Sequence, residues 1–129
     1  MGNADSSTNG RHRSILVVDD DAAIRGTLQR LLRNQPVTVS CAESGAAALD
    51  LLQGGLRPQL ILLDIDMPGM NGWQVLERLK QDPALAPIPV VIISGAHQSA
   101  DVDGVTCFLP KPFSLDKLLS VIREHAAPG

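Results

Sequence analysis

Residues 60–72, LILLDIDMPGMNG, join an unbroken aliphatic run to a sharp break in the chain. Four large aliphatic side chains in succession are typical of a strand that is buried on both faces of a parallel sheet. The run ends at Asp64, a second acid follows at Asp66, and residues 67–69 (MPG) form a turn that ends the strand. An acid placed directly after a buried strand predicts a functional carboxylate at the edge of a sheet.

Apolar runs and amphipathic segments alternate along the rest of the chain. Strands are predicted at 14–18, 37–42, 60–63, 89–93 and 106–109, with the alternating segment 37–42 the most exposed. Between and after them, residues spaced by three and four predict helices. The expected helix starts are Asp20, Ser44, Asn71 or Gly72, and Ser114. This alternation indicates an α/β fold, with helices on both faces of a parallel sheet.

Two details of the helices are specific enough to check. Asp20 is the expected cap of the first helix, and Asp21 is then an exposed acid of its first turn, favoured by the helix dipole. The second helix is expected to run from its cap at Ser44 to about Gln53. Its expected inward residues are Ala47, Ala48, Leu51 and Leu52.

The 129 residues and their composition limit the kind of protein. The length suits one domain, expected at 14–125, between a disordered tail at 1–13 and a short tail at 126–129. A formal net charge of −3 argues against direct nucleic-acid binding. Without an apolar run of about 18 residues or a signal peptide, we expect a cytoplasmic protein with no membrane partner. Cys41 and Cys107 lack metal-site spacing and are expected to be buried, reduced thiols.

Chemically useful side chains follow four of the predicted strands. They are Asp19-Asp20-Asp21, Asp64, Ser94 and Lys111. Ligands of open parallel sheets bind at this edge. Adjacent carboxylates repel unless a cation lies among them, and an all-oxygen ligand set suits Mg²⁺. With a lysine and a hydroxyl added, such a site suits a transferring phosphoryl group, for which a carboxylate can be the nucleophile.

Four motifs resemble the receiver domain of bacterial two-component response regulators, the CheY-like family. They are VVDDD (17–21), LLDIDMPGMNG (62–72), VIISGA (91–96) and LPKPF (109–113), and the likeness covers about residues 14–125. The resemblance implies a flavodoxin-like, doubly wound, five-stranded parallel sheet in strand order 2-1-3-4-5, flanked by five helices. It implies phosphoryl transfer from a histidine kinase or a histidine phosphotransfer protein, and signalling to a downstream protein by conformational change.

The resemblance also assigns the site residues. Asp64 is similar to the phosphoacceptor. The resemblance implies a domain that catalyses its own phosphorylation and dephosphorylation but is not an enzyme in the usual sense. Asp20 resembles a direct Mg²⁺ ligand, Asp19 one that acts through water, and Asp66 the residue whose backbone carbonyl binds the ion. We further hypothesise that the side chain of Asp66 alters the lifetime of the phosphate.

The remaining assignments concern the switch. Lys111 resembles the lysine that pairs with Asp64 and later with the phosphate, and Ser94 the hydroxyl residue that moves toward the phosphate. Phe108 occupies the place of an aromatic switch residue, with plain core packing as the alternative. Pro112 matches a proline that often follows a cis peptide bond.

The chain departs from the family pattern between Ser94 and the last strand. Only Gly95–Val105 are available there, whereas a helix of about 10–14 residues needs flanking loops of roughly 2–6 residues each. We therefore expect the fourth helix to be shortened or missing. We also expect dimerisation through the face that this helix usually forms to be weakened or replaced.

Two other functions fit parts of the sequence. A receiver-like interaction module without phosphorylation would tolerate the shortened segment, although it would not need the acids, Ser94 and Lys111. A phosphatase of the haloacid dehalogenase type also uses an Asp-x-Asp motif, but Pro68 and the absence of room for a cap domain count against it. The start at Met1 and the lack of an output domain favour a stand-alone regulator.

Overall fold

The computed structural model describes residues 12–94 and 105–126. One sheet contains five parallel strands, in the order β2-β1-β3-β4-β5. The strands are β1 (Arg13–Val18), β2 (Val37–Ala42), β3 (Leu60–Asp64), β4 (Val90–Ser94) and β5 (Cys107–Pro110). The predicted doubly wound, flavodoxin-like topology is confirmed.

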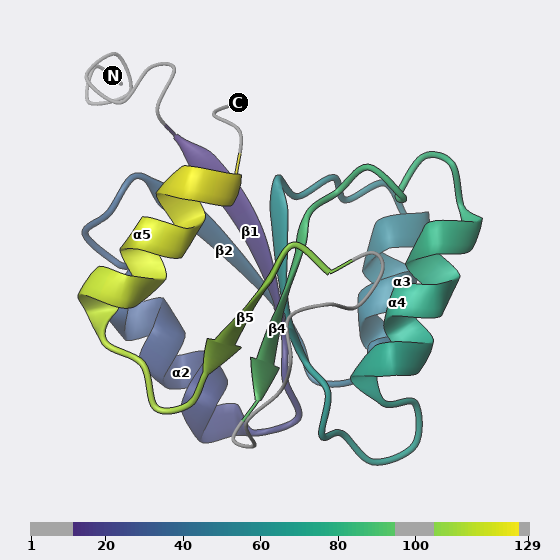
Figure 1. Ribbon diagram of the computed structural model, residues 1–129, viewed down its shortest axis with the longest axis horizontal. Helices are drawn as coiled ribbons and strands as arrows, with labels where there is room; N and C mark the ends of the chain where they lie inside the picture. The colour runs from purple at the N-terminus through teal and green to yellow at the C-terminus, as the bar shows by residue number, and fades with distance from the viewer. Residues whose placement is uncertain (1–11, 95–104, 127–129) are drawn as a thin grey trace.

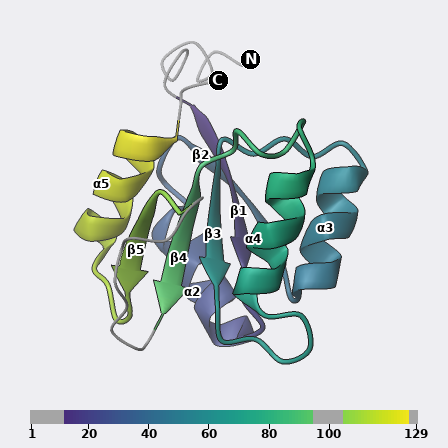
Figure 2. The ribbon, with the colours of Figure 1, turned by 45° about the vertical axis from the view of Figure 1, so that its right-hand side comes forward.

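Helices cover both faces of the sheet (Figures 1 and 2). On one face lie α2 (Ala22–Leu31) and α5 (Leu115–His125), and on the other lie α3 (Gly45–Gln53) and α4 (Gly72–Gln81). Each pair closes its own aliphatic core against the sheet. Residues 95–104, where the shortened or missing helix was predicted, lie outside the described residues.

The position of each strand in the sheet explains its hydrophobic pattern. Every residue of β3 and β4 is buried, because both strands have a neighbour on each side and helices above and below. β2 lies at the edge, and only Ala42 of that strand is fully buried. The continuous run at 60–63 and the alternating run at 37–42 therefore report two different environments.

Asp21, and not Asp20, caps α2, so that prediction was wrong. The Asp21 carboxylate accepts a hydrogen bond from the Ala23 amide at 2.9 Å. Asp19 accepts one from the Asp21 amide at 3.0 Å, which bends the chain before the helix begins. Asp20 lies at this bend, and its side chain is therefore free of the capping role and exposed.

The inward face of α3 also differs from the prediction at two positions. Leu51 is 40% exposed, whereas Leu49 is buried. The buried positions of α3 are 45, 48, 49 and 52, and this spacing forms a single stripe along the helix. Leu51 lies outside that stripe.

The first strand begins one residue earlier than predicted, at Arg13. The Arg13 amide donates to the Pro36 carbonyl at 3.0 Å, and its side chain donates to the Ala126 carbonyl at 2.9 Å. The first bond joins the starts of β1 and β2, and the second joins β1 to the end of α5. None of the helices in residues 12–94 and 105–126 has the length and apolar character needed to cross a membrane.

Candidate functional site

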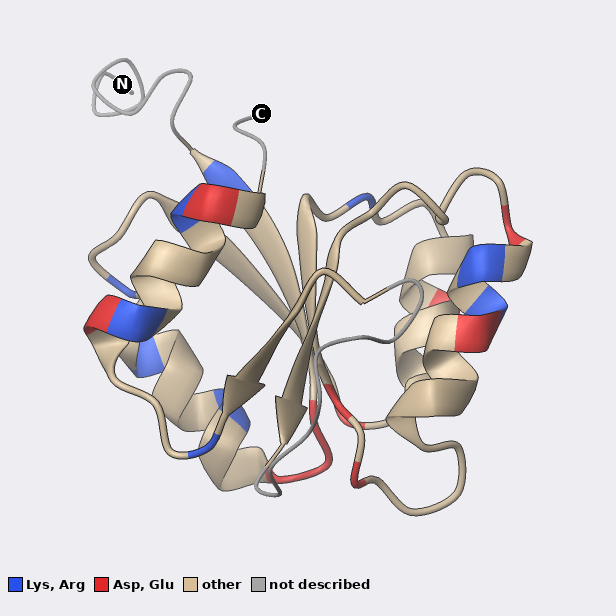
Figure 3. Cartoon of the chain, in the orientation of Figure 1, with Lys and Arg blue, Asp and Glu red and all other residues tan. Residues whose placement is uncertain are grey.

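The parallel sheet gathers the predicted site residues at the carboxyl ends of its strands. Asp19 follows β1, Asp64 ends β3, Ser94 ends β4 and Lys111 follows β5. The pairing of Val18 with Leu63, the pairing of Asp64 with Ile93 and the 2.8 Å hydrogen bond from the Lys111 amide to the Ser94 carbonyl keep the four ends level. Figure 3 shows acidic residues concentrated at this end of the sheet.

Three carboxylates converge there. Asp19, Asp20 and Asp64 each present an oxygen, and these oxygens lie within 4.8 Å of one another. Asp19 and Asp64 are 0% and 3% exposed, whereas Asp20 is open to solvent. Two buried acids and one exposed acid thus form a cluster that can be reached from outside.

Asp19 is held through its backbone and its side chain together. Its amide donates to the Ala42 carbonyl at 3.1 Å, and its carbonyl accepts from Arg25 Nη1 at 2.6 Å. Its carboxylate accepts from the Asp21 amide and from Lys111 Nζ. Sequence reasoning identified Lys111 but missed Arg25, whose only signal was a cation one turn into the helix that follows the acids.

Lys111 lies between the two buried acids. Its Nζ is 3.9 Å from Asp64 Oδ1, which gives the expected ion pair, and 3.2 Å from Asp19 Oδ2, to which it also donates a hydrogen bond. The peptide bond between Lys111 and Pro112 is cis, the geometry that the resemblance implied. The lysine side chain is 24% exposed, and its ammonium forms an ion pair with each of the two buried acids.

Asp66 contributes to the site through its backbone. Its amide donates to Asp64 Oδ1 at 3.0 Å, while its side chain is exposed. This bond orients the Asp64 carboxylate immediately after the strand ends. The sequence predicted a role for the Asp66 carbonyl, and the amide contact is an additional one. The turn continues through Gly69, whose φ of +72° is strained for any residue with a side chain.

Burial is the main electrostatic influence on Asp64. It raises the pKa of the Asp64 carboxyl, the Asp66 amide opposes that rise, and the charge of Asp19 adds to it while Lys111 opposes it. Three carboxylates of the cluster face one paired ammonium, that of Lys111. A hard divalent cation matches both the charge and the all-oxygen ligand set, so the residues present fit Mg²⁺.

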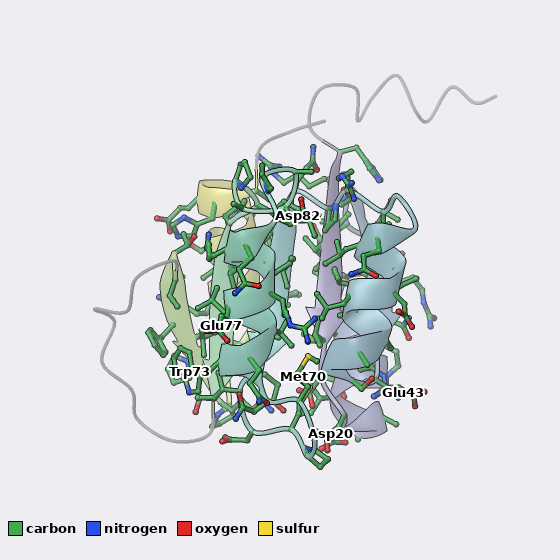
Figure 4. All side chains as sticks on the ribbon, turned by 90° about the vertical axis from the view of Figure 1, so that its right-hand side faces the viewer. Asp20, Glu43, Met70, Trp73, Glu77 and Asp82 are labelled. Carbon is green, nitrogen blue, oxygen red and sulfur yellow. The ribbon has the colours of Figure 1, made fainter. Side chains whose placement is uncertain are left out.

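Two glycines let the helices approach the loop that follows Asp64 closely. A Cβ at Gly72 would lie 2.6 Å from Ile65 Cα and 2.7 Å from the Asp64 carbonyl oxygen. A Cβ at Gly45 would lie 3.1 Å from Met70 Sδ and 2.6 Å from a methyl of Val75. Figure 4 shows Met70 between the starts of α3 and α4. The first turn of α4 thus rests on the backbone that carries Asp64.

Ser94 and Phe108, the predicted switch residues, are placed differently. Ser94 is 2% exposed and belongs to the edge that carries the acids. Phe108 is partly buried on the α3 and α4 face, where its ring centroid lies 6.3 Å from that of Trp73, with the planes at 56°. In Figure 4, Trp73 projects from the start of α4 on the side of β5. An aromatic pair therefore connects these two elements.

Both cysteines are free thiols, as expected, but they are only partly buried. Burial raises the pKa of each thiol. Cys41 lies in β2 and Cys107 in β5, the two edge strands of the sheet. Neither cysteine belongs to the acidic cluster.

Comparison with known proteins gives consistent matches. A family described as "Response regulator receiver domain" matches residues 15–123. The DNA-binding transcriptional regulator NtrC of Escherichia coli (strain K12) is 37% identical over 116 residues, which are 85% of this chain and 24% of NtrC. Response regulator MprA of Mycobacterium sp. (strain KMS) is 39% identical over 112 residues, which are 84% of this chain and 48% of MprA. The chain thus spans half or less of the length of these relatives.

A solved structure supports the fold independently. Vibrio cholerae chemotaxis protein CheY4 aligns with a TM-score of 0.80 over 88% of this chain and 98% of its own, at 24% identity. At that identity, the likeness concerns the fold alone.

Proposed function

Because the chain belongs to the response regulator receiver domain family, we propose that it takes a phosphoryl group onto Asp64 and signals through the resulting change in conformation. The observation that carries this proposal is the convergence of Asp19, Asp20 and Asp64 beside the Lys111 ammonium. We expect the donor to be a phosphohistidine of a histidine kinase or of a histidine phosphotransfer protein.

The proposed step is an in-line displacement at phosphorus. An Asp64 carboxylate oxygen forms the new P–O bond while the bond from phosphorus to the donor's imidazole nitrogen breaks, and the electron pair of that bond stays on the imidazole. The Asp66 amide, bonded to Asp64 Oδ1, orients the nucleophile. Lys111, at 3.9 Å from the same oxygen, offsets charge on the transferring phosphoryl oxygens.

The donor chemistry of the cluster supports a role for Mg²⁺. The carboxylates of Asp19, Asp20 and Asp64 would hold the ion, with the Asp66 carbonyl as a further oxygen ligand. When bound, the ion supplies positive charge against the phosphoryl oxygens. Lys111 already bonds to Asp19, so the lysine holds that carboxylate in place beside the other ligands.

Three further roles belong to the same proposal. Ser94, at the carboxyl end of β4, would donate its hydroxyl proton to a phosphoryl oxygen on Asp64. Phe108 would change its packing against Trp73 when the site is phosphorylated. The exposed side chain of Asp66 would influence the water that hydrolyses the acyl phosphate, and so change the phosphate lifetime.

Incubation with acetyl phosphate and Mg²⁺, followed by intact-mass measurement, tests the acceptor. We expect a mass gain of one phosphoryl group that requires Mg²⁺ and is absent from Asp64→Asn. Asp66→Asn is the matched control, since it removes a neighbouring acid and should retain the gain while changing its rate of decay. A gain that persists in Asp64→Asn would overturn the assignment. No gain in the parent protein, together with no Mg²⁺ binding, would favour the unphosphorylated interaction module.

A further inference from the structure

We propose that Arg25 is a positioning residue of the metal site: its guanidinium fixes the Asp19–Asp20 peptide in the orientation that binds the cation. The inference rests on the proposed Mg²⁺ site. It assigns a cation of α2, which belongs to none of the four motifs, to the acidic cluster. The main observation in its favour is the 2.6 Å hydrogen bond from Arg25 Nη1 to the Asp19 carbonyl oxygen.

The bonded carbonyl belongs to the peptide unit that joins the two acids. Since a peptide unit is planar, holding the oxygen of Asp19 also fixes the direction of the Asp20 amide and the path of the chain into Asp20. Asp20 itself is exposed and lies at the bend before α2. Arg25 therefore constrains the most open acid of the cluster without touching its carboxylate.

The Asp19 loop is held from two sides by two cations. Lys111 Nζ bonds to the carboxylate of Asp19 at 3.2 Å, and Arg25 bonds to its backbone. The guanidinium lies at the carboxyl end of β2, where it lines a hollow together with Cys41, Ala42 and Glu43. The Asp19 amide bonds to the Ala42 carbonyl at this same place. Arg25 thus connects α2 to the loop that follows β1, beside the carboxyl end of β2.

Positioning and simple electrostatics predict opposite results for the removal of Arg25. A positive charge near a cation site repels the cation, so its loss alone would tighten Mg²⁺ binding. If Arg25 positions the peptide, its loss leaves a carbonyl without its charge-assisted partner and lets the loop relax, which weakens Mg²⁺ binding. The sign of the change in affinity therefore separates the two roles.

The test is Mg²⁺ titration of the full chain by calorimetry, at one ionic strength, with the Mg²⁺-induced rise in Tm as a second readout. Arg25→Met keeps the apolar part of the side chain and removes charge and donors. We expect its affinity for Mg²⁺ to fall roughly tenfold, as for one lost charged hydrogen bond. Arg30→Gln is the matched control, because Arg30 is an exposed arginine of the same helix whose side chain donates to the Thr27 hydroxyl at 3.3 Å. The Mg²⁺ affinity of this variant should stay within about twofold of the parent value, as for an exposed charge.

Unchanged or tighter Mg²⁺ binding by Arg25→Met would overturn the inference. If that variant does not fold, Arg25→Lys decides the matter, since it keeps the charge and loses the planar, multidentate donor. Weaker binding by Arg25→Lys supports positioning, and parent-like binding refutes it. Absence of Mg²⁺ binding in the parent protein would overturn the proposed metal site as well, which distinguishes failure of the function from failure of this inference.

Discussion

Replacing Gly72 by alanine should destabilise the domain, although alanine is the better helix former. The added Cβ would meet the backbone of Ile65 at 2.6 Å and the carbonyl oxygen of Asp64 at 2.7 Å, and neither can rotate away as a flexible side chain could. Overpacking costs about 1–3 kcal/mol, and two backbone contacts below 3.0 Å place this substitution in the upper part of that range, at about 2–3 kcal/mol. The gain in helix propensity is at most about 1 kcal/mol. We therefore expect a net loss of about 1–2 kcal/mol.

For a domain of this size, that loss corresponds to a fall in Tm of about 4–8 °C. Urea unfolding of the unphosphorylated protein, followed by circular dichroism, measures the free energy of unfolding. Gly26→Ala is the matched control, because Gly26 lies inside α2 and its new Cβ would meet only the flexible Arg30 side chain, at 3.4 Å. That variant should gain up to about 1 kcal/mol. If Gly72→Ala were as stable as Gly26→Ala, the close approach of α4 to the backbone of Asp64 and Ile65 would not restrict the residue at position 72.

Three other outcomes follow from the structure. Millimolar Mg²⁺ should raise the Tm of the parent protein and should do so much less for Asp20→Asn, as thermal melts with and without chelator will show. Burial raises the pKa of Cys41 and Cys107, so the folded state keeps both thiol protons to higher pH than the unfolded chain does. Stability should therefore fall as the pH rises through the ordinary thiol value of about 8.5, and a double alanine variant should lose this part of the dependence. Phosphorylation should change the fluorescence of Trp73, and Phe108→Leu should remove most of that change.

The fold could be predicted from sequence because its main determinants are local. The run at 60–63 is buried on both sides, as is typical of a central strand in a covered parallel sheet. Ser44, Asn71 and Ser114 each accept a hydrogen bond from the amide three residues on, the pattern by which caps are recognised in a sequence. Because the carboxyl ends of parallel strands lie at one edge of the sheet, the acids that follow these strands could also be predicted to lie together.

The errors have equally physical reasons. Three consecutive acids offer three possible caps, and the choice of Asp21 depends on the Asp19 carboxylate taking the Asp21 amide, a contact that spacing does not reveal. Leu51 and Leu49 are equally apolar, and which of them faces inward is decided by the packing of α3 against the sheet and α4, where Leu49 joins the core. Gly72 was read as a helix start, whereas its importance comes from the backbone of Ile65, against which it packs.

The position of Lys111 affects how the site would respond to a phosphoryl group. The pair with Asp64 that the resemblance implied is present at 3.9 Å, but Lys111 Nζ also pairs with Asp19 and is nearer to it, at 3.2 Å. Asp64 would gain negatively charged oxygens on phosphorylation, whereas Asp19 would not. A movement of about 1 Å would bring the ammonium within hydrogen-bonding distance of the Asp64 side. The Lys111 amide stays bonded to the Ser94 carbonyl at 2.8 Å, so the side chain can make this movement without a change in the pairing of β4 and β5. Lys111 can thus stabilise Asp19 in the unphosphorylated protein and the phosphoryl group afterwards.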